Sequence, residues 1–320
     1  MKRLVLLLLA LSLSIPAWAR PNNRNEAIRV LEEFFGGRMG VNQMVNRLSF
    51  LGEAGYGADE LIAAYKKADP KLQGLILEGL VGLGMFDADT DKIFLRALDS
   101  GDVAQMITAC RGLAKAKSPT APPRLIELLA ARQPAVRREA AKALGELGAA
   151  KAGAPLIAAA KKEEDLEVRL AMVVAVGRAG DKKQVPALEA MLAGDSETTR
   201  LAAAQALCLL GAKSGVQYAN KLLASDQKIE RLQGVLLFEG ATAKVAGPPL
   251  KVALADPDHR VRSTAARVLA QGGDKSKVEW LVLESAKAVG EDRLPYEDQL
   301  EKLRLTDEAR QEILKKAGLK

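Results

Sequence analysis

The chain has 320 residues, of which 27% are charged, 48% are hydrophobic and only 4% are aromatic. This composition is too apolar for a disordered chain, and two cysteines exclude both a disulfide framework and a cysteine-rich zinc module. The single histidine, His259, excludes most histidine-based metal and catalytic sites, and the low aromatic content argues against a stacking platform for single-stranded nucleic acid.

Residues 1–19 have the three parts of a secretory signal peptide. Lys2 and Arg3 form a positive n-region, residues 4–15 form an apolar run, and Ala17-Trp18-Ala19 is an A-x-A cleavage site. The apolar run is shorter than the roughly 20 residues that a membrane span needs. The sequence therefore predicts a periplasmic or secreted protein that begins at Arg20 and has no membrane span. Loss of Lys2 and Arg3 lowers the net charge from +7 to +5.

A unit of about 31 residues recurs through the mature chain, which is the mark of a repeat architecture. Apolar or small residues stand three, four and seven positions after an anchor arginine, on one face of a helix. A glycine suited to end that helix stands eleven positions after the anchor, at Gly148, Gly180, Gly211 and Gly273. Gly240 comes early, so we expect the fourth unit to end its helix differently. The anchors are Arg137, Arg169, Arg200, Arg231 and Arg262.

A second apolar segment precedes each anchor, and proline is tolerated in the first turn of a helix. Each unit therefore predicts an A helix, a short turn and a B helix, with no strand. The A helices are expected to begin near Pro123, Pro155, Pro186, Val216 and Pro249.

Several columns of the repeat resemble a known family. Residues 254–262 read Leu-Ala-Asp-Pro-Asp-His-Arg-Val-Arg and are followed by Ala265, Ala266 and Leu269. This unit resembles a HEAT repeat, in the short HEAT-like form found in phycobilin lyases. The expected fold is all-α, a right-handed α-solenoid of stacked antiparallel helix pairs. We expect N-terminal capping helices at 20–57, a HEAT-like array at 58–275 and C-terminal capping helices at 276–320.

The resemblance also implies a structural role for the anchor arginines and a binding surface. In HEAT repeats an aspartate before the B helix and the B-helix arginine form a stacked polar ladder, and Asp256 matches that aspartate. The other units depart from the pattern, so an irregular ladder is expected. B helices line the concave side of HEAT arrays. The outward positions would be polar and mixed in charge: Arg138, Lys142, Glu146, Glu167, Arg178, Gln205 and Arg267.

A lysine recurs just after each B helix, which would place five ammonium groups along one edge over roughly 35–40 Å. The simplest interpretation is that these cations stabilise helix C-termini and keep the edge soluble. The alternative is that the edge binds an acidic partner or an anionic polymer. The five residues are Lys151, Lys182, Lys213, Lys244 and Lys275.

The remaining candidates for chemistry are few. Cys110 and Cys208 fall on B helices three units apart and should remain unbridged, small core residues. His259 is expected to be an exposed turn residue, and no second ligand stands at metal-binding spacing. No catalytic motif or phosphate-binding loop is present, so we expect no catalytic residues, metal or cofactor.

Three classes of function remain open. The favoured one is a non-enzymatic scaffold, monomeric, that binds an unidentified and possibly acidic protein partner through the B-helix surface or the lysine row. The alternatives are a subunit or accessory factor of an enzyme resembling phycobilin lyases, and a binder of an anionic polymer. Nucleic acid is disfavoured because the mature charge is only +5 and aromatic residues are few.

Overall fold

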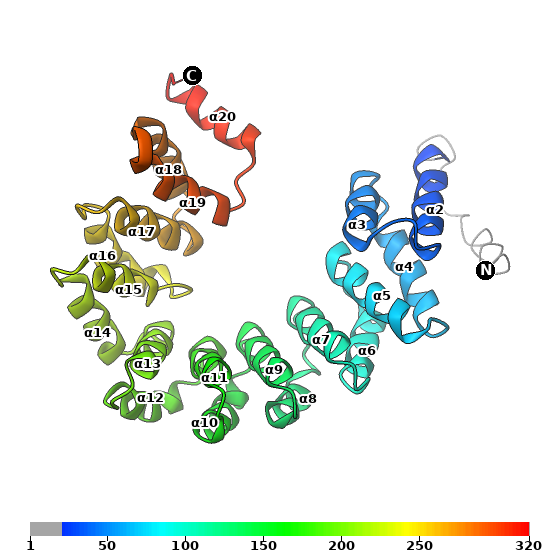
Figure 1. The fold of residues 1–320 in the computed structure, drawn as a ribbon, viewed down its shortest axis with the longest axis horizontal. Helices are drawn as coiled ribbons and strands as arrows, with labels where there is room; N and C mark the ends of the chain where they lie inside the picture. The colour runs from blue at the N-terminus through cyan, green and yellow to red at the C-terminus, as the bar shows by residue number, and fades with distance from the viewer. Residues whose placement is uncertain (1–20, 320) are drawn as a thin grey trace. The chain divides into compact units, whose positions relative to one another are not determined.

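The computed structural model describes residues 21–319, and that range is helical with no strand (Figure 1). The predicted signal peptide lies outside the described residues. The chain divides into two compact units, one ending at Ala121 and the other beginning at Pro122. The predicted all-α solenoid of stacked helix pairs is confirmed.

Residues 21–121 form six α-helices. Aspartate side chains accept hydrogen bonds from backbone N–H groups at the starts of three of them, through Asp69, Asp87 and Asp102. These bonds satisfy donors that have no partner inside the helix. The helices are α2 (Pro21–Phe35), α3 (Val41–Phe50), α4 (Ala54–Tyr65), α5 (Pro70–Leu83), α6 (Ala88–Ala97) and α7 (Val103–Lys115).

Residues 122–319 contain the five clear repeats and a C-terminal set of helices. The A helices are α8 (Pro122–Glu127) with the 3-10 turn η1 (Leu128–Ala130), α10 (Gly153–Lys162), α12 (Val185–Leu192), α14 (Lys213–Leu223) and α16 (Ala243–Ala253). The B helices are α9 (Pro134–Glu146), α11 (Leu166–Ala179), α13 (Glu197–Leu210), α15 (Lys228–Leu236) and α17 (His259–Gln271). The array is followed by α18 (Ser276–Lys287), η4 (Gly290–Arg293), α19 (Leu294–Lys302) and α20 (Asp307–Lys316).

Glycines end the B helices as the spacing predicts. Gly148, Gly180, Gly211 and Gly273 all have positive φ, between 63° and 105°, a region that favours glycine because it has no Cβ. The fourth unit differs, also as expected. Its B helix, α15, has nine residues and ends at Leu236, whereas α11 and α13 each have 14.

Neighbouring B helices approach each other closely where one carries glycine and the next carries alanine. An ideal Cβ placed on Gly177 of α11 would lie 2.6 Å from both Cα and the carbonyl oxygen of Ala206 on α13. No real Cβ is accommodated at that distance. The small-residue columns of the repeat therefore set the spacing of the array, and burial of the leucine and valine columns stabilises it.

The predicted start of the fifth A helix is wrong. α16 begins at Ala243, and Pro248 and Pro249 lie inside it rather than in its first turn. Proline in a helix interior removes a backbone donor, so the carbonyls of Lys244 and Val245 lose their usual partners within the helix. Leu250, which is fully buried, holds this segment against the core that Val235 and Phe238 share.

Candidate functional site

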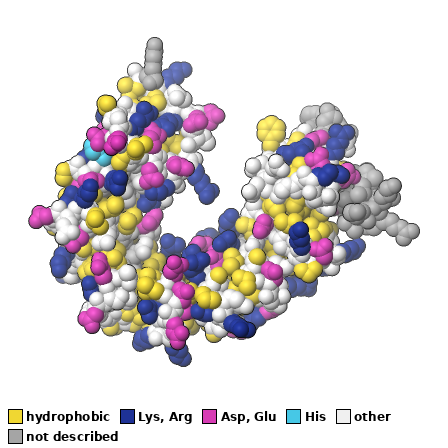
Figure 2. All heavy atoms as spheres, in the orientation of Figure 1, with side chains coloured by type: hydrophobic (Ala, Val, Ile, Leu, Met, Phe, Trp, Pro, Cys, Tyr) yellow, Lys and Arg dark blue, Asp and Glu magenta, His cyan; other side chains and the backbone are white. Residues whose placement is uncertain are grey.

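The B helices of the second unit follow one another along the inner side of the helix array, and the A helices follow one another along the outer side (Figure 1). α9 packs on α11, α11 on α13, and α15 on α17. The exposed side chains of these helices form a continuous face, which we call the B-helix surface. On the side of this unit visible in Figure 2, acidic, basic and hydrophobic side chains are interspersed.

A groove with a volume of about 740 Å³ crosses four of these helices, α9, α11, α13 and α15. Its larger apolar side chains are Leu170, Val174, Leu201 and Leu236, and small alanines lie between them. Leu236 is 37% exposed, which is unusual for leucine in a packed array. The polar lining consists of Lys142, Glu146, Arg178, Thr198, Gln205, Gln233 and Glu239.

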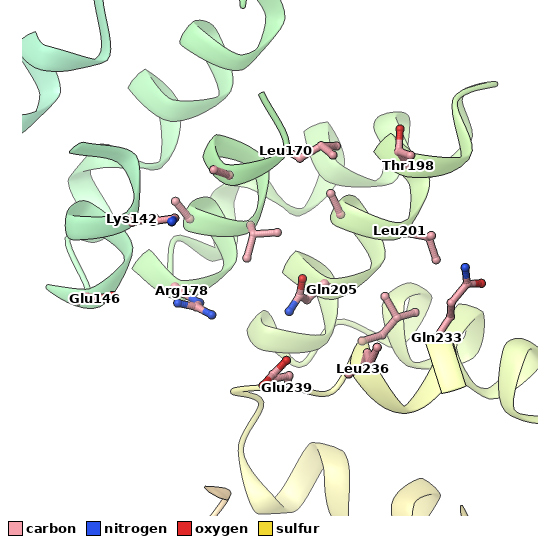
Figure 3. A pocket seen from close by; sticks show the side chains of 15 residues that line it. Lys142, Glu146, Leu170, Arg178, Thr198, Leu201, Gln205, Gln233, Leu236 and Glu239 are labelled. Carbon is pink, nitrogen blue, oxygen red and sulfur yellow. The ribbon is translucent and has the colours of Figure 1, made fainter. Parts of the chain in front are cut away.

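Figure 3 shows how these side chains are distributed. Lys142 and Glu146 of α9 lie at one end of the groove, and Gln233 and Leu236 of α15 lie at the other. Leu236 also lines a second, more polar cavity of about 600 Å³ bounded by α15, α17 and α19. The two hollows therefore meet at Leu236, the last residue of the short helix α15.

The charged side chains at one end of the groove form an ion pair, and those at the other end do not. Glu239 pairs with the buried Arg267 at 2.7 Å, so the charge at the α15 end is already neutralised. Among the described residues, Lys142, Glu146 and Arg178 form no ion pair, and all three are exposed. The α9 end can therefore exchange its water contacts for contacts with a partner.

The sequence predicts part of the polar rim of this groove but not its apolar centre. Lys142, Glu146, Arg178 and Gln205 line the groove as expected for outward positions. Arg138 instead pairs with Glu167 at 2.8 Å, and Arg267 is buried rather than outward, because Glu239 and Gln299 enclose it. The missed signal is the residue directly after the anchor arginine. It is leucine in the three middle units, as Leu170, Leu201 and Leu232, and polar in the two outer ones.

The anchor arginines join consecutive helices. Arg137 donates through NH1 to the carbonyls of Ala131 and Arg132, at the end of the preceding A helix. Its Nε and NH2 groups donate to the Glu163 carboxylate of the next unit at 2.6 and 2.7 Å. This contact holds the pKa of Glu163 below its ordinary value. Arg231 repeats the arrangement with Asp256 at 2.7 and 3.1 Å.

This geometry corrects the expected ladder in two ways. Asp256 accepts hydrogen bonds from Arg231 of the preceding unit through its carboxylate, whereas Arg262 of its own unit donates to its backbone carbonyl at 2.6 Å. Burial alone would raise the pKa of Asp256, but the bond from Arg231, the bond from the Asp258 N–H and the charges of Arg231 and Arg262 together outweigh it, and the pKa is lowered. The acid that pairs with Arg137 is Glu163, which no spacing rule selected.

Two rungs of the ladder are absent within residues 21–319. Arg169 contacts only the Glu163 carbonyl, at 3.4 Å, and its buried Nε has no hydrogen-bond partner. Arg200 donates to the carbonyls of Gly194 and Asp195 and to no carboxylate of the next unit. The ladder is therefore irregular, and both interruptions fall on the helices that form the middle of the groove, α11 and α13.

The five repeated lysines are all exposed. Each lysine follows a B helix and also stands at the start of the next A helix or of the short turn that leads into it. Each lysine therefore lies between the negative end of one helix and the positive end of the next, and the two dipoles oppose each other there.

His259 was wrongly expected to be an exposed turn residue. It is the first residue of α17, and its side chain is 34% exposed. Its Nδ1 lies 3.0 Å from the Tyr296 hydroxyl and 2.8 Å from NH2 of Arg262, which ties α17 to α19. Cys110 and Cys208 are both buried thiols, and burial raises the pKa of Cys208 to about 12.

Residues 21–319 contain no group of three or more His, Cys, Asp or Glu side chains placed to hold a metal ion. Within that range, no helix combines the length and apolarity needed to cross a bilayer.

The family model described as HEAT repeats matches residues 90–171 and 122–208. Comparison with curated proteins gives no match. Among solved structures, the complex of CpcE and CpcF of phycocyanin lyase from Nostoc sp. PCC7120 is similar at 17% identity. Its TM-score is 0.51, over 77% of this chain and 94% of that chain. Below 25% identity, this likeness shows the fold and not the activity.

Two further solved structures have lower TM-scores. An engineered protein is 16% identical, with a TM-score of 0.44 over 99% of this chain and 97% of that chain. Human deoxyhypusine hydroxylase in complex with glycerol is 19% identical, with a TM-score of 0.35 over 80% of this chain and 99% of that chain. The helix pairs and the repeat columns agree with the family match, and residues 90–208 are similar to HEAT repeats.

Proposed function

We propose that this chain is an exported, non-enzymatic scaffold that binds a protein partner in the groove of the B-helix surface. The observation that carries the proposal is the cluster of solvent-accessible leucine and valine side chains, Leu170, Val174, Leu201 and Leu236, set among charged and amide side chains. Specific protein interfaces have this composition, with an apolar centre and a polar rim.

The dimensions of the groove favour a helical segment of the partner. Four B helices spaced about 8–10 Å apart give a length of about 24–30 Å. A helix rises about 1.5 Å per residue, so a segment of about 16–20 residues would cover that length. An amphipathic helix would place its apolar stripe over the leucines and its polar face toward solvent.

The chemistry of the groove supports binding rather than catalysis. Its 15 lining residues, all within the described part of the chain, include no Ser, Cys, His or Asp. Nucleophilic and acid–base catalysis use pairs of such side chains within hydrogen-bond reach. Of the two glutamates, Glu239 is engaged by Arg267.

Export is part of the proposal and rests on residues 1–19. Expression of the full chain should yield a processed protein whose N-terminus is Arg20, in the fraction outside the cytoplasm. Replacing Leu8 and Leu9 with Lys should block processing because the apolar run would be interrupted. Accumulation of unprocessed wild-type chain in the cytoplasm would refute this part.

The binding site is tested with two matched double variants. Leu170→Glu with Leu236→Glu places two carboxylates in the groove. Val252→Glu with Val289→Glu makes the same change at side chains that are 76% and 84% exposed and lie outside it. The tagged chain and both variants are used to capture partners from the organism of origin, and affinities are then measured with the purified partner.

The expected result is that the wild type and the control variant bind equally and the groove variant binds at least about 30-fold more weakly, as for loss of an interface hot spot. Far-UV circular dichroism must show equal helix content in all three. Equal binding by the groove variant would place the partner elsewhere on the molecule. A weaker variant, Leu236→Ala, covers the case in which the double variant does not fold.

A further inference from the structure

A second surface of the same unit has a different chemistry. The lysine edge consists of Lys151, Lys182, Lys213, Lys244 and Lys275, one from each of five consecutive turns between a B helix and the next A helix. Lys213 is the first residue of α14, Lys244 the second residue of α16, and Lys275 the N-cap residue of α18. Since A helices run in the same direction, these positions share one edge of the array.

The positive charge of this edge is not balanced within the described residues. None of the five lysines forms an ion pair there, and all five are exposed. The nearby carboxylates have other roles. Asp181 accepts hydrogen bonds from the Lys183 N–H and the Gln184 amide, and Asp274 accepts from the Ser276 hydroxyl.

Most of the lysine edge lacks the features of a protein interface, the exception being a hollow beside Lys244 that Val216 and Val252 also line. The other exposed residues around its turns are mostly small or polar, such as Gly148, Gly180 and Ser276. An interface between folded proteins needs a buried apolar or aromatic centre. The turns also carry no aromatic side chain on which bases could stack. What remains is a row of point charges at regular spacing, which suits a flexible chain of anions.

We propose that the lysine edge binds a linear, non-protein polyanion that carries phosphate groups along its length. With a spacing of about 8–10 Å per repeat, the five ammonium groups extend over about 30–40 Å. A flexible polymer can place successive phosphates against successive lysines without a fixed backbone geometry. This surface and its ligand are independent of the groove, so the proposal stands or falls separately from the protein partner.

Long-chain inorganic polyphosphate is the probe, and binding to the purified chain is measured by isothermal titration calorimetry from 50 to 200 mM salt. If five lysines each neutralise one phosphate, the logarithm of the binding constant should fall with the logarithm of salt concentration with a slope of about −3.5. Binding should therefore weaken by about 100-fold over that range.

Two variants with equal charge change locate the site. The edge variant replaces all five lysines of the lysine edge with Gln. The control replaces five exposed lysines near the opposite, C-terminal ends of helices of the same unit: Lys161, Lys162, Lys221, Lys287 and Lys315. The edge variant should lose the salt dependence and bind at least about 100-fold more weakly at 50 mM salt. The control should retain the wild-type slope.

Three results would overturn the proposal. The first is no binding of polyphosphate by the wild-type chain. The second is equal loss in both variants, which would make net charge and not the edge responsible. The third is tighter, edge-dependent binding of poly-glutamate than of polyphosphate, which would assign the edge to an acidic protein. Circular dichroism confirms that each variant is folded.

Discussion

One methyl group added at Gly177 tests whether the B helices are held at a separation that only glycine permits. The new Cβ would lie 2.6 Å from Cα and from the carbonyl oxygen of Ala206, so α11 and α13 would have to move apart. Overpacking costs about 1–3 kcal/mol. Alanine regains up to about 1 kcal/mol of helix propensity. Because the contacted atoms are backbone, the cost lies at the upper end, and Gly177→Ala should lose about 2 kcal/mol.

Two other glycines provide a graded control. At Gly145 the added Cβ would lie 3.1 Å from the Arg178 Cβ and 3.3 Å from the Ala175 Cα. The cost of this milder overpacking and the gain in helix propensity should nearly cancel. At Gly74 of α5, the nearest atom to the added Cβ would be the Gln105 Cγ at 3.8 Å, an ordinary contact distance. Gly74→Ala should therefore gain up to about 1 kcal/mol.

The assay is urea unfolding followed by far-UV circular dichroism, with the slope of the transition compared between variants so that a change of midpoint reports stability. The expected order of stability is Gly74→Ala above wild type, Gly145→Ala near wild type, and Gly177→Ala lowest. If Gly177→Ala were as stable as Gly74→Ala, close backbone contact would not set the spacing of the array.

Three other predictions concern ionisable and buried groups. Arg137→Ala should lower the free energy of unfolding by about 1.5–3 kcal/mol, because Glu163, whose side chain is 4% exposed, loses its partner. Arg138→Ala next to it should cost less than about 1 kcal/mol, since Glu167 is 79% exposed. Both are read from urea midpoints, and equal losses would contradict the burial argument. Burial alone would raise the pKa of Glu297, but hydrogen bonds from Arg310, Ser285 and Arg293 lower it to about 2 from an ordinary value of 4.5. Its stabilisation is therefore complete above about pH 4.5 and is lost as pH falls toward 2, so Glu297→Gln should show a flatter dependence of melting temperature on pH in that range. Cys208, with its pKa raised to about 12, should resist iodoacetamide at pH 8 until urea unfolds the chain, and mass spectrometry of its peptide checks this.

The repeat and its boundaries could be predicted because they depend on local chemistry. Gly180 and Gly211 end their helices through a backbone conformation that the residue itself permits, and spacing from the anchor arginine locates them. The position of Gly240 also predicts the early end of α15. The start of α16 was predicted wrongly from Pro249, because this proline lies inside the helix, where tertiary packing of Leu250 compensates for the lost donors.

The partners of the charged side chains could not be predicted because they depend on contacts between units. Arg137 reaches Glu163 of the next unit, 26 residues away, and His259 reaches Tyr296, 37 residues away. The groove could be predicted only in part. Its polar rim could be predicted from outward helix positions, but the exposure of Leu236 depends on the shortness of α15 and on the neighbouring helices.

The two missing rungs of the arginine ladder have a mechanical consequence. At Arg137 and Arg231, a charge-assisted contact holds two consecutive units together, whereas at Arg169 and Arg200 no carboxylate of the following unit within residues 122–319 is engaged. The array therefore resists tension unevenly along its length. Pulled from its ends, the second unit should yield first between α13 and α15, which lack both the arginine–carboxylate contact and the extensive packing that joins α11 to α13. That junction lies within the groove, so a ligand bound there would contact both sides of it.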